Sequence, residues 1–594
     1  MTTPWEIAPP HPGSEALARE LRVSPTLAAL LAGRGFAEPA AARRFLGPRL
    51  SDLTPPDTMA GLRAAVDLLA AALRDGRRVG VFGDYDVDGV SSATLIGSFL
   101  RDCGADVVIR VGRREAGYGL TEADAAAMVE RGCDLVVACD CGTSDAAAVG
   151  LLRGRGLDVI VVDHHQVPAT PLPASALVNP QQPGCRFPFK GLASVGLAFY
   201  LCATLRTALR AAGHRFPART VAPGLAAASG APAADDGPDP RDGLDLVAVG
   251  TIADLAPLVD DNRILVRHGL RMLARSSHPG LKALAEISGS NGESFRAEDV
   301  AFRIAPRLNA PGRLGDADAA LGVLLETDPR RARALASECD AANRTRQRLQ
   351  EAVYAEALAA VEARGPGAPL VFAAGQGWHP GVVGIVAAKL VERYGLPATV
   401  IALEGRVGRG SARTVPGFHL YEALRQCAAH LVRFGGHAAA AGMTVETTRL
   451  DAFREALEGA ARAAFPAGPP AAAVHVEARL PLHALTRDLC REVATLEPFG
   501  HGNPEPVICC LGLRVTEQRL VGERQDHLAL TLAGDGAEAR AIGFRMADRA
   551  PGVGATVDVA FTPEPDDWRG QGAVQLRIKD LRPADAAGSP GERP

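Results

Sequence analysis

The sequence predicts a multidomain α/β protein: a doubly wound parallel sheet, a long helix, a second and smaller α/β domain, and a C-terminal β-barrel. Short apolar runs alternate with helix-like segments in the first third of the chain, a pattern typical of βαβ units. Residues 330–364 contain neither Pro nor Gly, and several β-rich segments lie near the C-terminus. At 594 residues the chain is also too long for a single core.

The first α/β domain is expected at residues 61–327, after a small helical lead-in at residues 1–60. Its strands are predicted from short apolar runs, at residues 77–84, 105–111, 133–140 and 157–165. In doubly wound sheets ligands bind beyond the carboxyl ends of the strands, so polar residues at these ends are candidate site residues. The segment 221–243 is rich in Ala, Pro, Gly and Asp without periodicity, which predicts a disordered insertion.

The second half of the chain is expected to contain a connecting helix, an α/β domain and a barrel. The helix is predicted at residues 328–364 and the second α/β domain at residues 365–470. Close-spaced short strands separated by Gly, Asp and Pro follow from about Leu480, so an OB-fold is predicted at residues 471–585. A disordered tail is expected at residues 586–594.

Composition limits the possible function. The formal net charge is only −4, so any contact with nucleic acid must come from local clusters of basic residues. The eleven cysteines form no repeated CxxC pattern, which is typical of thiols kept reduced in a cytosol. The sequence shows no signal-peptide pattern and no apolar stretch long enough to span a bilayer. A cytoplasmic protein is therefore expected.

The segment GDYDVDG is the first candidate for chemistry. It places Asp84, Asp86 and Asp88 at alternate positions after a predicted strand, so in an extended segment their carboxylates would share one side. Three converging carboxylates repel one another, and hard cations relieve that repulsion. A solvated acidic turn or a Ca²⁺ loop is the alternative. An EF-hand is disfavoured because a strand enters the segment and no Glu closes it.

Acids and imidazoles also follow other predicted buried segments. Asp140 ends one strand, and Asp163, His164 and His165 end another. A lone Asp after a strand is more often a cap or turn residue, and we interpret its neighbours Cys139 and Cys141 as packing residues. Asp254 lies inside an apolar run, where an unpaired acid would be costly to bury.

Together these residues predict that four strand ends bring Asp, Asp, His and Asp to one edge of the sheet. Such a set is typical of two-metal sites for phosphoryl transfer. Oxygen ligands with one or two imidazoles favour Mn²⁺ or Mg²⁺ over a thiolate zinc site.

Nine ordered motifs resemble the DHH phosphoesterase superfamily and, within it, the RecJ exonuclease family. They are GDYDVDG, VACDCG, VVDHH, LDLVAVGTIADLAPLVDDNRILV, RIAPRLNAPGRLGDA, GWHPGVVGIVAAKL, GSARTVPGFHL, FGGHAAAAGMT and EPFGHGNPEP. The resemblance implies a DHH domain, a DHH-associated domain and an OB-fold. It also implies a metal-dependent, single-stranded-DNA-specific 5′-to-3′ exonuclease that releases 5′-mononucleotides in DNA repair and recombination. Single-stranded DNA, a single-stranded-DNA-binding protein and a helicase are the implied partners of a monomeric enzyme.

The resemblance also implies residue roles. The implied ligands of two Mn²⁺ or Mg²⁺ ions are Asp86, Asp88, Asp140, His164 and Asp254, with Asp140 bridging. His165 is implied to contact the scissile phosphate, with Asp84 and Asp163 supporting the site. The implied substrate-binding residues are His165, Arg307, Arg313, Arg413 and a turn formed by Gly435, Gly436 and His437. The chain has Phe82 where many members of the superfamily have His, which leaves the coordination of one ion open.

Two other functions fit the same motifs. A phosphodiesterase of the same superfamily would cleave short oligonucleotides or cyclic dinucleotides, but the additional β-rich region favours a longer substrate. A non-catalytic DNA-binding scaffold would have lost ligands that this chain keeps. Aromatic residues are few in the predicted barrel, so contacts to the phosphate backbone are expected to matter more there than base stacking.

Overall fold

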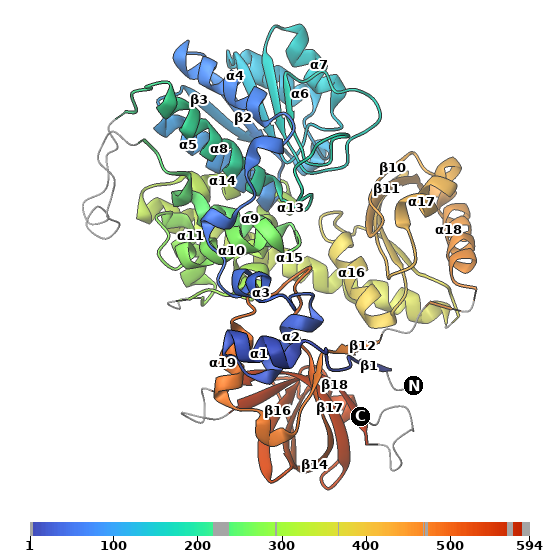
Figure 1. Ribbon diagram of the computed structural model, residues 1–594. Coiled ribbons are helices and arrows are strands. Elements are labelled where there is room, and N and C mark those ends of the chain that lie inside the picture. The colour runs from blue at the N-terminus through green and yellow to red at the C-terminus, as the bar shows by residue number, and fades with distance from the viewer. Residues whose placement is uncertain are drawn as a thin grey trace. The chain divides into compact units, whose positions relative to one another are not determined.

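A computed structural model describes residues 4–217, 237–290, 294–365, 367–466, 468–469, 473–566 and 574–584 (Figure 1). The chain forms two compact units. The larger unit comprises residues 53–470 together with 500–503, and the smaller unit comprises residues 1–52, 471–499 and 504–594. Among the described residues, no helix combines the length and apolar character needed to cross a membrane.

The larger unit begins with a five-stranded parallel sheet of order β3-β2-β4-β5-β6. Its strands are β2 (Val79–Gly83), β3 (Val107–Val111), β4 (Leu135–Cys139), β5 (Asp158–Val162) and β6 (Ala176–Val178). Val136 and Ala138 pack on one face with residues of α6 (Glu122–Glu130) and α7 (Ala146–Gly154). Both faces of β4 are buried, as expected for a sheet covered by helices on both sides. The predicted doubly wound sheet is confirmed, although β6 was not predicted.

Helices complete this domain. They are α4 (Leu62–Arg74), α5 (Val87–Asp102), α8 (Ser194–Ala211), α9 (Leu244–Ala253), α10 (Asp260–Leu273), α11 (Pro279–Ile287), α12 (Ala297–Asp299), α13 (Ala305–Leu314) and α14 (Asp318–Leu325). Of the predicted insertion at residues 221–243, residues 221–236 lie outside the described residues. Pro240–Gly243 forms a 3₁₀ helix that leads into α9, so the prediction of disorder is wrong there.

The long connecting helix is confirmed as α15 (Pro329–Arg364). The Asp328 side chain caps it by accepting hydrogen bonds from the backbone N–H groups of Arg330 and Arg331. Pro329 occupies the first helical position, where its missing N–H is not needed.

A mixed five-stranded sheet of order β10-β11-β9-β8-β7 follows. The strands are β7 (Val371–Gln376), β8 (Ala398–Glu404), β9 (Val407–Arg413), β10 (Arg433–Gly436) and β11 (Ala440–Glu446). One core cluster joins the sheet to α17 (Leu420–Gln426) and α18 (Leu450–Ala464), and a second joins it to α15 and α16 (Val383–Tyr394). The predicted second α/β domain is therefore present (Figure 1).

The smaller unit contains the predicted barrel. Its six-stranded sheet closes through a β14–β17 pairing, which confirms a barrel of the OB type. The strands are β13 (Ala478–Arg479), β14 (Ile508–Val521), β15 (His527–Gly534), β16 (Ala537–Gly543), β17 (Thr556–Pro565) and β18 (Val574–Pro583). The predicted tail, residues 586–594, lies outside the described residues.

The N-terminal residues belong to this smaller unit. Its helices α1 (Ser14–Leu21), α2 (Pro25–Gly33) and α3 (Pro39–Leu46) share a core with α19 (Arg487–Ala494). Strand β1 (Trp5–Ile7), which the sequence did not indicate, pairs in parallel with β12 (Val474–Val476). The Trp5 Nε1–H donates to Asp580 at 2.5 Å, and the Arg582 guanidinium lies 4.4 Å from the centre of the Trp5 ring.

Candidate metal centre and substrate pocket

The acidic motif after β2 forms a strand-to-helix turn. Asp84 directly follows the strand, whereas Asp86 caps α5 by accepting from the backbone N–H groups of Asp88 at 3.0 Å and Gly89 at 3.2 Å. The prediction of an extended segment is therefore wrong, because the chain turns into a helix at Asp86. A Cβ on Gly89 would lie 2.5 Å from the Asp84 backbone nitrogen, so the turn requires glycine there.

The N-terminus of α8 orients two of the predicted ligands. The Asp88 carboxylate accepts from the backbone N–H groups of Ser194 at 2.7 Å and Val195 at 2.9 Å, where a helix N-terminus favours negative charge. The Ser194 hydroxyl donates to Asp140 Oδ1 at 3.0 Å. Asp140 itself adopts φ 60° directly after β4, a conformation that Asp tolerates better than most residues.

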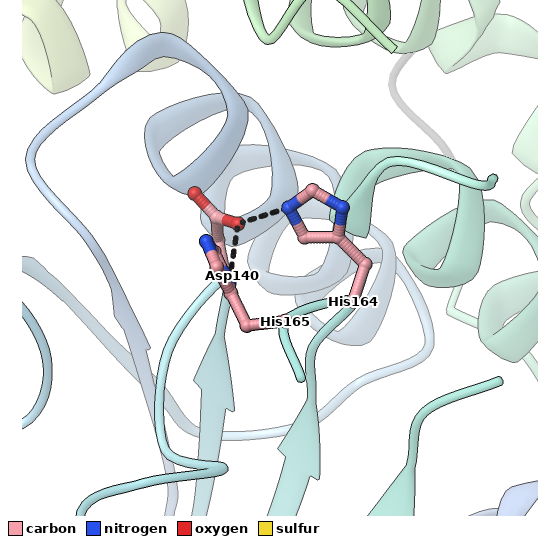
Figure 2. Close-up of side chains that lie close together, drawn as sticks. All are labelled: Asp140, His164 and His165. Atoms are coloured by element: carbon pink, nitrogen blue, oxygen red, sulfur yellow. Dashed lines mark ion pairs between the residues drawn. The ribbon is translucent and has the colours of Figure 1, made fainter. Parts of the chain in front are cut away.

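The imidazoles after β5 have different partners. Asp163 accepts from His165 Nδ1 at 2.7 Å and from the backbone N–H groups of Thr143, His164 and His165. His164 Nε2 lies 3.4 Å from Asp140 Oδ1 and 3.8 Å from Asp254 Oδ2. Figure 2 shows both imidazoles directed toward the Asp140 carboxylate. The structure therefore brings together residues from β4, β5 and the segment after α9.

Asp254 reaches the cluster from a helix, so the prediction of four strand ends is wrong for this residue. It caps the C-terminus of α9, where unpaired carbonyl groups make negative charge unfavourable. The backbone N–H groups of Leu255 and Ala256 return to the Ile252 and Thr251 carbonyl oxygens at 3.2 and 3.3 Å, which is a Schellman ending. Leu255 takes the left-handed position at φ 60°, at a cost of roughly 1–2 kcal/mol for a residue with a Cβ.

Without a bound cation, the carboxylates of the cluster would give it an excess of negative charge. Burial, followed by repulsion from Asp86, raises the pKa of Asp88 to about 7 and the pKa of Asp140 well above its usual range. Burial and the carboxylates of Asp88 and Asp86 raise the pKa of Asp254 to about 9. A divalent cation would reverse these shifts by neutralising the carboxylates.

The two histidines differ in charge. Burial and the neighbouring His165 lower the pKa of His164 to about 4, so His164 is neutral at pH 7. Burial opposes protonation of His165, but its hydrogen bond to Asp163 raises the pKa to about 9. The same hydrogen bond outweighs burial to hold the pKa of Asp163 below its usual range. His164 is therefore suited to ligate a metal, whereas His165 carries a proton.

The donor set fits divalent metal ions. Asp84 Oδ2 and His164 Nε2 are buried without a hydrogen-bond partner among the described residues, although buried polar atoms are normally paired. In each of two groups, the three potential ligand atoms lie within 4.8 Å of one another. These groups are Asp140, His164 and His165, and Asp88, His164 and Asp254. Carboxylate oxygens with an imidazole nitrogen favour Mn²⁺ or Mg²⁺, while Cys139 and Cys141 are buried packing residues as predicted.

Phe82 supplies no ligand atom. Its side chain is fully buried in the apolar cluster beneath α6 and α7. The histidine that the resemblance implies for many members at this position is therefore missing, and Asp84 Oδ2, two residues further on, has no hydrogen-bond partner within the described residues.

A large pocket lies beside the cluster, within the larger unit. Its volume is about 1360 Å³, and both α/β domains line it. Asp163 and His165 form part of its wall, and the His437 ring lies 5.9 Å from the His165 ring, centre to centre. Pockets for single small ligands span roughly 300–1,000 Å³, so this one has room for more than one small group.

Arginines make the pocket positive. Arg313 is partly buried, and burial together with neighbouring arginines lowers its pKa to about 10, which still leaves it charged at pH 7. Arg413 donates to Ser411 Oγ at 3.0 Å and to the Ala412 carbonyl at 2.8 Å, and Arg114 lies over the Tyr85 ring at 4.6 Å. None of these three partly buried arginines pairs with a carboxylate within the described part of the chain, and such cations are typical of anion-binding sites.

The predicted substrate residues separate into two groups. Arg313, Arg413, Gly435, Gly436 and His437 line the pocket. Gly435 and Gly436 belong to strand β10, so only His437 lies in the predicted turn. Arg307 is not among the pocket residues, because it donates to Asp340 Oδ1 at 2.9 Å and to the Arg303 carbonyl.

The sequence did not reveal several residues that hold this site. The Tyr118 hydroxyl donates to the Asp140 carbonyl at 2.7 Å and lies 3.1 Å from the His165 ring. Asn179 donates to the His165 carbonyl at 2.8 Å, and Ser194 positions Asp140 as described above. No local pattern indicates Ser194 or Asn179. Arg114 and Tyr118 follow strand β3, and this position after a strand of the sheet is the sequence signal that could have identified them.

Three family models match the chain. They are the DHH family N-terminal domain at residues 78–228, the DHHA1 domain at residues 367–463 and the RecJ OB domain at residues 476–580. These ranges fall on the parallel sheet, the mixed sheet and the barrel.

Relatives resemble the chain along most of its length. The single-stranded-DNA-specific exonuclease RecJ of Bacillus subtilis is 34% identical over 97% of this chain and 70% of the relative. The protein of the same name from Salmonella typhimurium is 34% identical over 94% of this chain and 96% of its own. The structure of Thermus thermophilus RecJ with Mn²⁺ matches at a TM-score of 0.82 and 33% identity, covering 99% of this chain and 80% of that one. The Mg²⁺ complex of the same protein matches at a TM-score of 0.76.

Proposed function

This chain belongs to the RecJ family, and from that premise we propose that it is a metal-dependent exonuclease specific for single-stranded DNA. Relatives that carry this name span nearly the whole chain at 34% identity. The observation that carries the proposal is the adjacency of two features: a buried group of carboxylates with a neutral imidazole, and a pocket lined by arginines.

The proposed ligands of two divalent ions are Asp86, Asp88, Asp140, His164 and Asp254, with Asp140 shared. The unpartnered His164 Nε2 and the raised pKa values of Asp88 and Asp254 support this assignment. When bound, Mn²⁺ or Mg²⁺ supplies a nucleophilic water near neutral pH and stabilises charge on the phosphate oxygens. Ser194 holds Asp140 through its hydroxyl and Asp88 through its backbone N–H.

His165 is the proposed contact to the scissile phosphate. Its Nδ1–H donates to Asp163 at 2.7 Å, which raises the His165 pKa to about 9 and keeps the ring cationic at pH 7. A cationic ring in the pocket wall can donate to a phosphate oxygen through a charge-assisted hydrogen bond. Asp163 also accepts three backbone N–H groups, so it fixes the orientation of the imidazole. Asp84 supports the turn that carries the acidic motif.

The pocket is the proposed site for the 5′ end of the strand. Arg313 and Arg413 are charged and available to phosphate oxygens, and His437 faces His165. Glycine at Gly435 and Gly436 lets the β10 backbone approach a phosphate closely. We propose 5′-to-3′ polarity and release of 5′-mononucleotides on this basis and on the family, in DNA repair and recombination. Arg307 would act indirectly, through Asp340 and α13.

The smaller unit supports a longer substrate. The OB-type barrel is the kind of module that binds single strands, and its family model is the RecJ OB domain. We further propose a monomer that acts in the cytoplasm beside a single-stranded-DNA-binding protein and a helicase. The eleven free cysteines, ten of them buried, suit a reducing compartment. The partners rest on the family alone.

One assay separates the proposal from its alternatives. Single-stranded, duplex, 5′-tailed and 3′-tailed DNA and a dinucleotide are incubated with Mn²⁺, with Mg²⁺ and with chelator. We expect metal-dependent release of mononucleotides from single strands and 5′ tails, and no product with chelator. Faster cleavage of the dinucleotide than of long strands would favour the small-substrate phosphodiesterase, and strand binding without cleavage would favour the scaffold.

A further inference from the structure

The corner between α9 and α10 carries Asp254 and has an unusual conformation. Leu255 adopts φ 60° and is 70% exposed, so neither glycine nor packing of its side chain holds the backbone there. Ala256 and Leu258, further along the corner, are buried. The carbonyl of Pro257 accepts a hydrogen bond from Asn262 Nδ2 at 3.0 Å, which anchors the end of the corner that is distant from Asp254.

A four-residue segment from the motif EPFGHGNPEP anchors the other end. Residues 500–503 belong to the larger unit, although the chain on both sides of them belongs to the smaller unit. His501 Nδ1 lies 3.0 Å from the Leu255 carbonyl oxygen, and the Leu258 backbone N–H donates to the His501 carbonyl at 2.7 Å. A carbonyl oxygen only accepts, so His501 Nδ1 carries the proton and donates.

The segment fits closely against the corner. A Cβ on Gly500 would lie 2.8 Å from Leu258 Cδ1, and a Cβ on Gly502, at φ 76°, would lie 3.1 Å from Pro257 Cβ. Paired backbone hydrogen bonds between Gly500 and Asn503 close the turn, and Asn503 is buried. The turn therefore presents the His501 side chain in one place.

We propose that His501 is a positioning residue for the metal centre. By donating to the Leu255 carbonyl it holds the left-handed residue that follows Asp254, and so fixes the carboxylate that lies 3.8 Å from His164. The inference rests on the proposed role of Asp254 as a ligand. Groups that orient a metal ligand set metal affinity without touching the ion.

Two substitutions of His501 separate its hydrogen bond from its ring. Asparagine places an N–H donor where Nδ1 lies but removes the ring, whereas phenylalanine keeps a ring and removes the donor. We expect H501N to bind Mn²⁺ like the wild type. We expect H501F to bind Mn²⁺ about fivefold more weakly, less than the roughly 10–100-fold loss when a partner that contacts a ligand directly is removed. His475, an exposed residue of β12, provides the control H475F.

The measurements are calorimetric titration of the metal-free full-length protein with Mn²⁺, and cleavage of single-stranded DNA as a function of Mn²⁺ concentration. H501F should need about fivefold more Mn²⁺ for half-maximal cleavage, with kcat at saturating Mn²⁺ and the melting temperature without metal unchanged. Equal binding by H501F and the wild type would overturn the inference, as would an equal loss in H501N. A wild type that neither binds Mn²⁺ nor cleaves DNA would instead overturn the proposed function.

A double-mutant cycle tests the same hydrogen bond independently. Glycine adopts the left-handed conformation without steric cost, so L255G should hold the corner without help from His501. The loss of Mn²⁺ affinity caused by H501F should therefore shrink in the L255G background, giving a coupling between the two positions. An undiminished loss would contradict the proposed route from His501 to Asp254.

Discussion

Two clusters of charged side chains in this protein differ in whether their charges are paired: one is partly buried in the smaller unit, and the other is largely buried in the larger unit. In the smaller unit, Glu505 lies 3.0 Å from Lys579 Nζ and also contacts Arg577, which pairs with Glu564 at 2.8 Å. Burial would raise the pKa of Glu505, but these cations lower it. In the larger unit, Asp88, Asp140 and Asp254 face one another, and their pKa values rise. Charge that is paired within the chain supports the fold, whereas charge left unpaired marks a place for an external cation.

Removing an unpaired carboxylate should give the largest effect on activity. Asp140→Ala is expected to lower cleavage about 10³-fold or more, because metal ions supply several kcal/mol of transition-state stabilisation. Its melting temperature without metal should stay the same or rise, since mutual repulsion among buried carboxylates is relieved. Cleavage assays and thermal unfolding in chelator measure the two effects. Unchanged turnover would contradict the site assignment.

Removing a paired carboxylate should lower stability without affecting the metal centre. Glu505→Gln leaves Arg577 and Lys579 with less compensation, so we expect the smaller unit to lose on the order of 2 kcal/mol of unfolding free energy. Mn²⁺ affinity should be unchanged, because all the proposed metal ligands lie in the larger unit. Urea unfolding in a W378F W568F background, in which Trp5 is the remaining tryptophan, measures the loss of stability by fluorescence, and calorimetric titration with Mn²⁺ measures the affinity. A loss of Mn²⁺ affinity would show that the comparison does not separate fold from function.

Because protons compete with the metal for the unpaired carboxylates, Mn²⁺ binding to this cluster should depend on pH. Asp88 and Asp254, with pKa values of about 7 and about 9 in the metal-free protein, must lose protons to bind a cation. Mn²⁺ affinity should therefore increase between pH 6 and pH 8, by up to about tenfold per pH unit for each proton released. Calorimetry in buffers of different ionisation enthalpy counts these protons. Binding without proton release would contradict the raised pKa values.

The pair formed by His278 and Asp245 should give the smallest effect. His278 Nδ1 lies 2.9 Å from Asp245 Oδ2, and this interaction outweighs burial to raise the pKa of His278. The stabilisation is fully present below the unfolded-state pKa of about 6.5 and is lost as pH rises through the higher folded-state value. We expect His278→Gln to flatten this decline by about 1 kcal/mol or less, as measured by urea unfolding between pH 5 and pH 9. A decline that persists unchanged in His278→Gln would exclude this pair as its source.

The sequence predicted the sheet and most of the acid cluster because these features are local. A short apolar run bounded by turn residues predicts a buried strand, and a polar residue that follows such a strand lies at the edge of the sheet. This reasoning placed Asp84, Asp140 and His164 correctly. It failed for Asp254, since an apolar run of ten residues fits a buried helix as well as a strand, and the structure forms α9.

The remaining residues depend on tertiary contacts. Ser194 reaches Asp140 from 54 positions away, and His501 reaches Leu255 from 246 positions away. A serine at the first position of a helix or a histidine between glycines has many uses, so neither carries a local signal. Arg307 and Arg313 belong to one motif and therefore carry the same sequence signal, but only Arg313 lines the pocket. Their different positions on α13 determine that Arg307 contacts Asp340 and that Arg313 lines the pocket.

The hydrogen bond between Trp5 in β1 and Asp580 in β18 has a consequence for how the protein is made. Trp5 finds Asp580 only after 575 further residues have been added, which takes roughly 30–120 s at ribosomal rates of about 5–20 residues per second. During that interval the larger unit can fold on the nascent chain, while the emerging N-terminal helices α1–α3 keep apolar faces that await α19. Newly synthesised chains should therefore depend on chaperones at their N-terminal helices. Early termination should release a folded larger unit whose N-terminal helices expose apolar surface and are prone to aggregate.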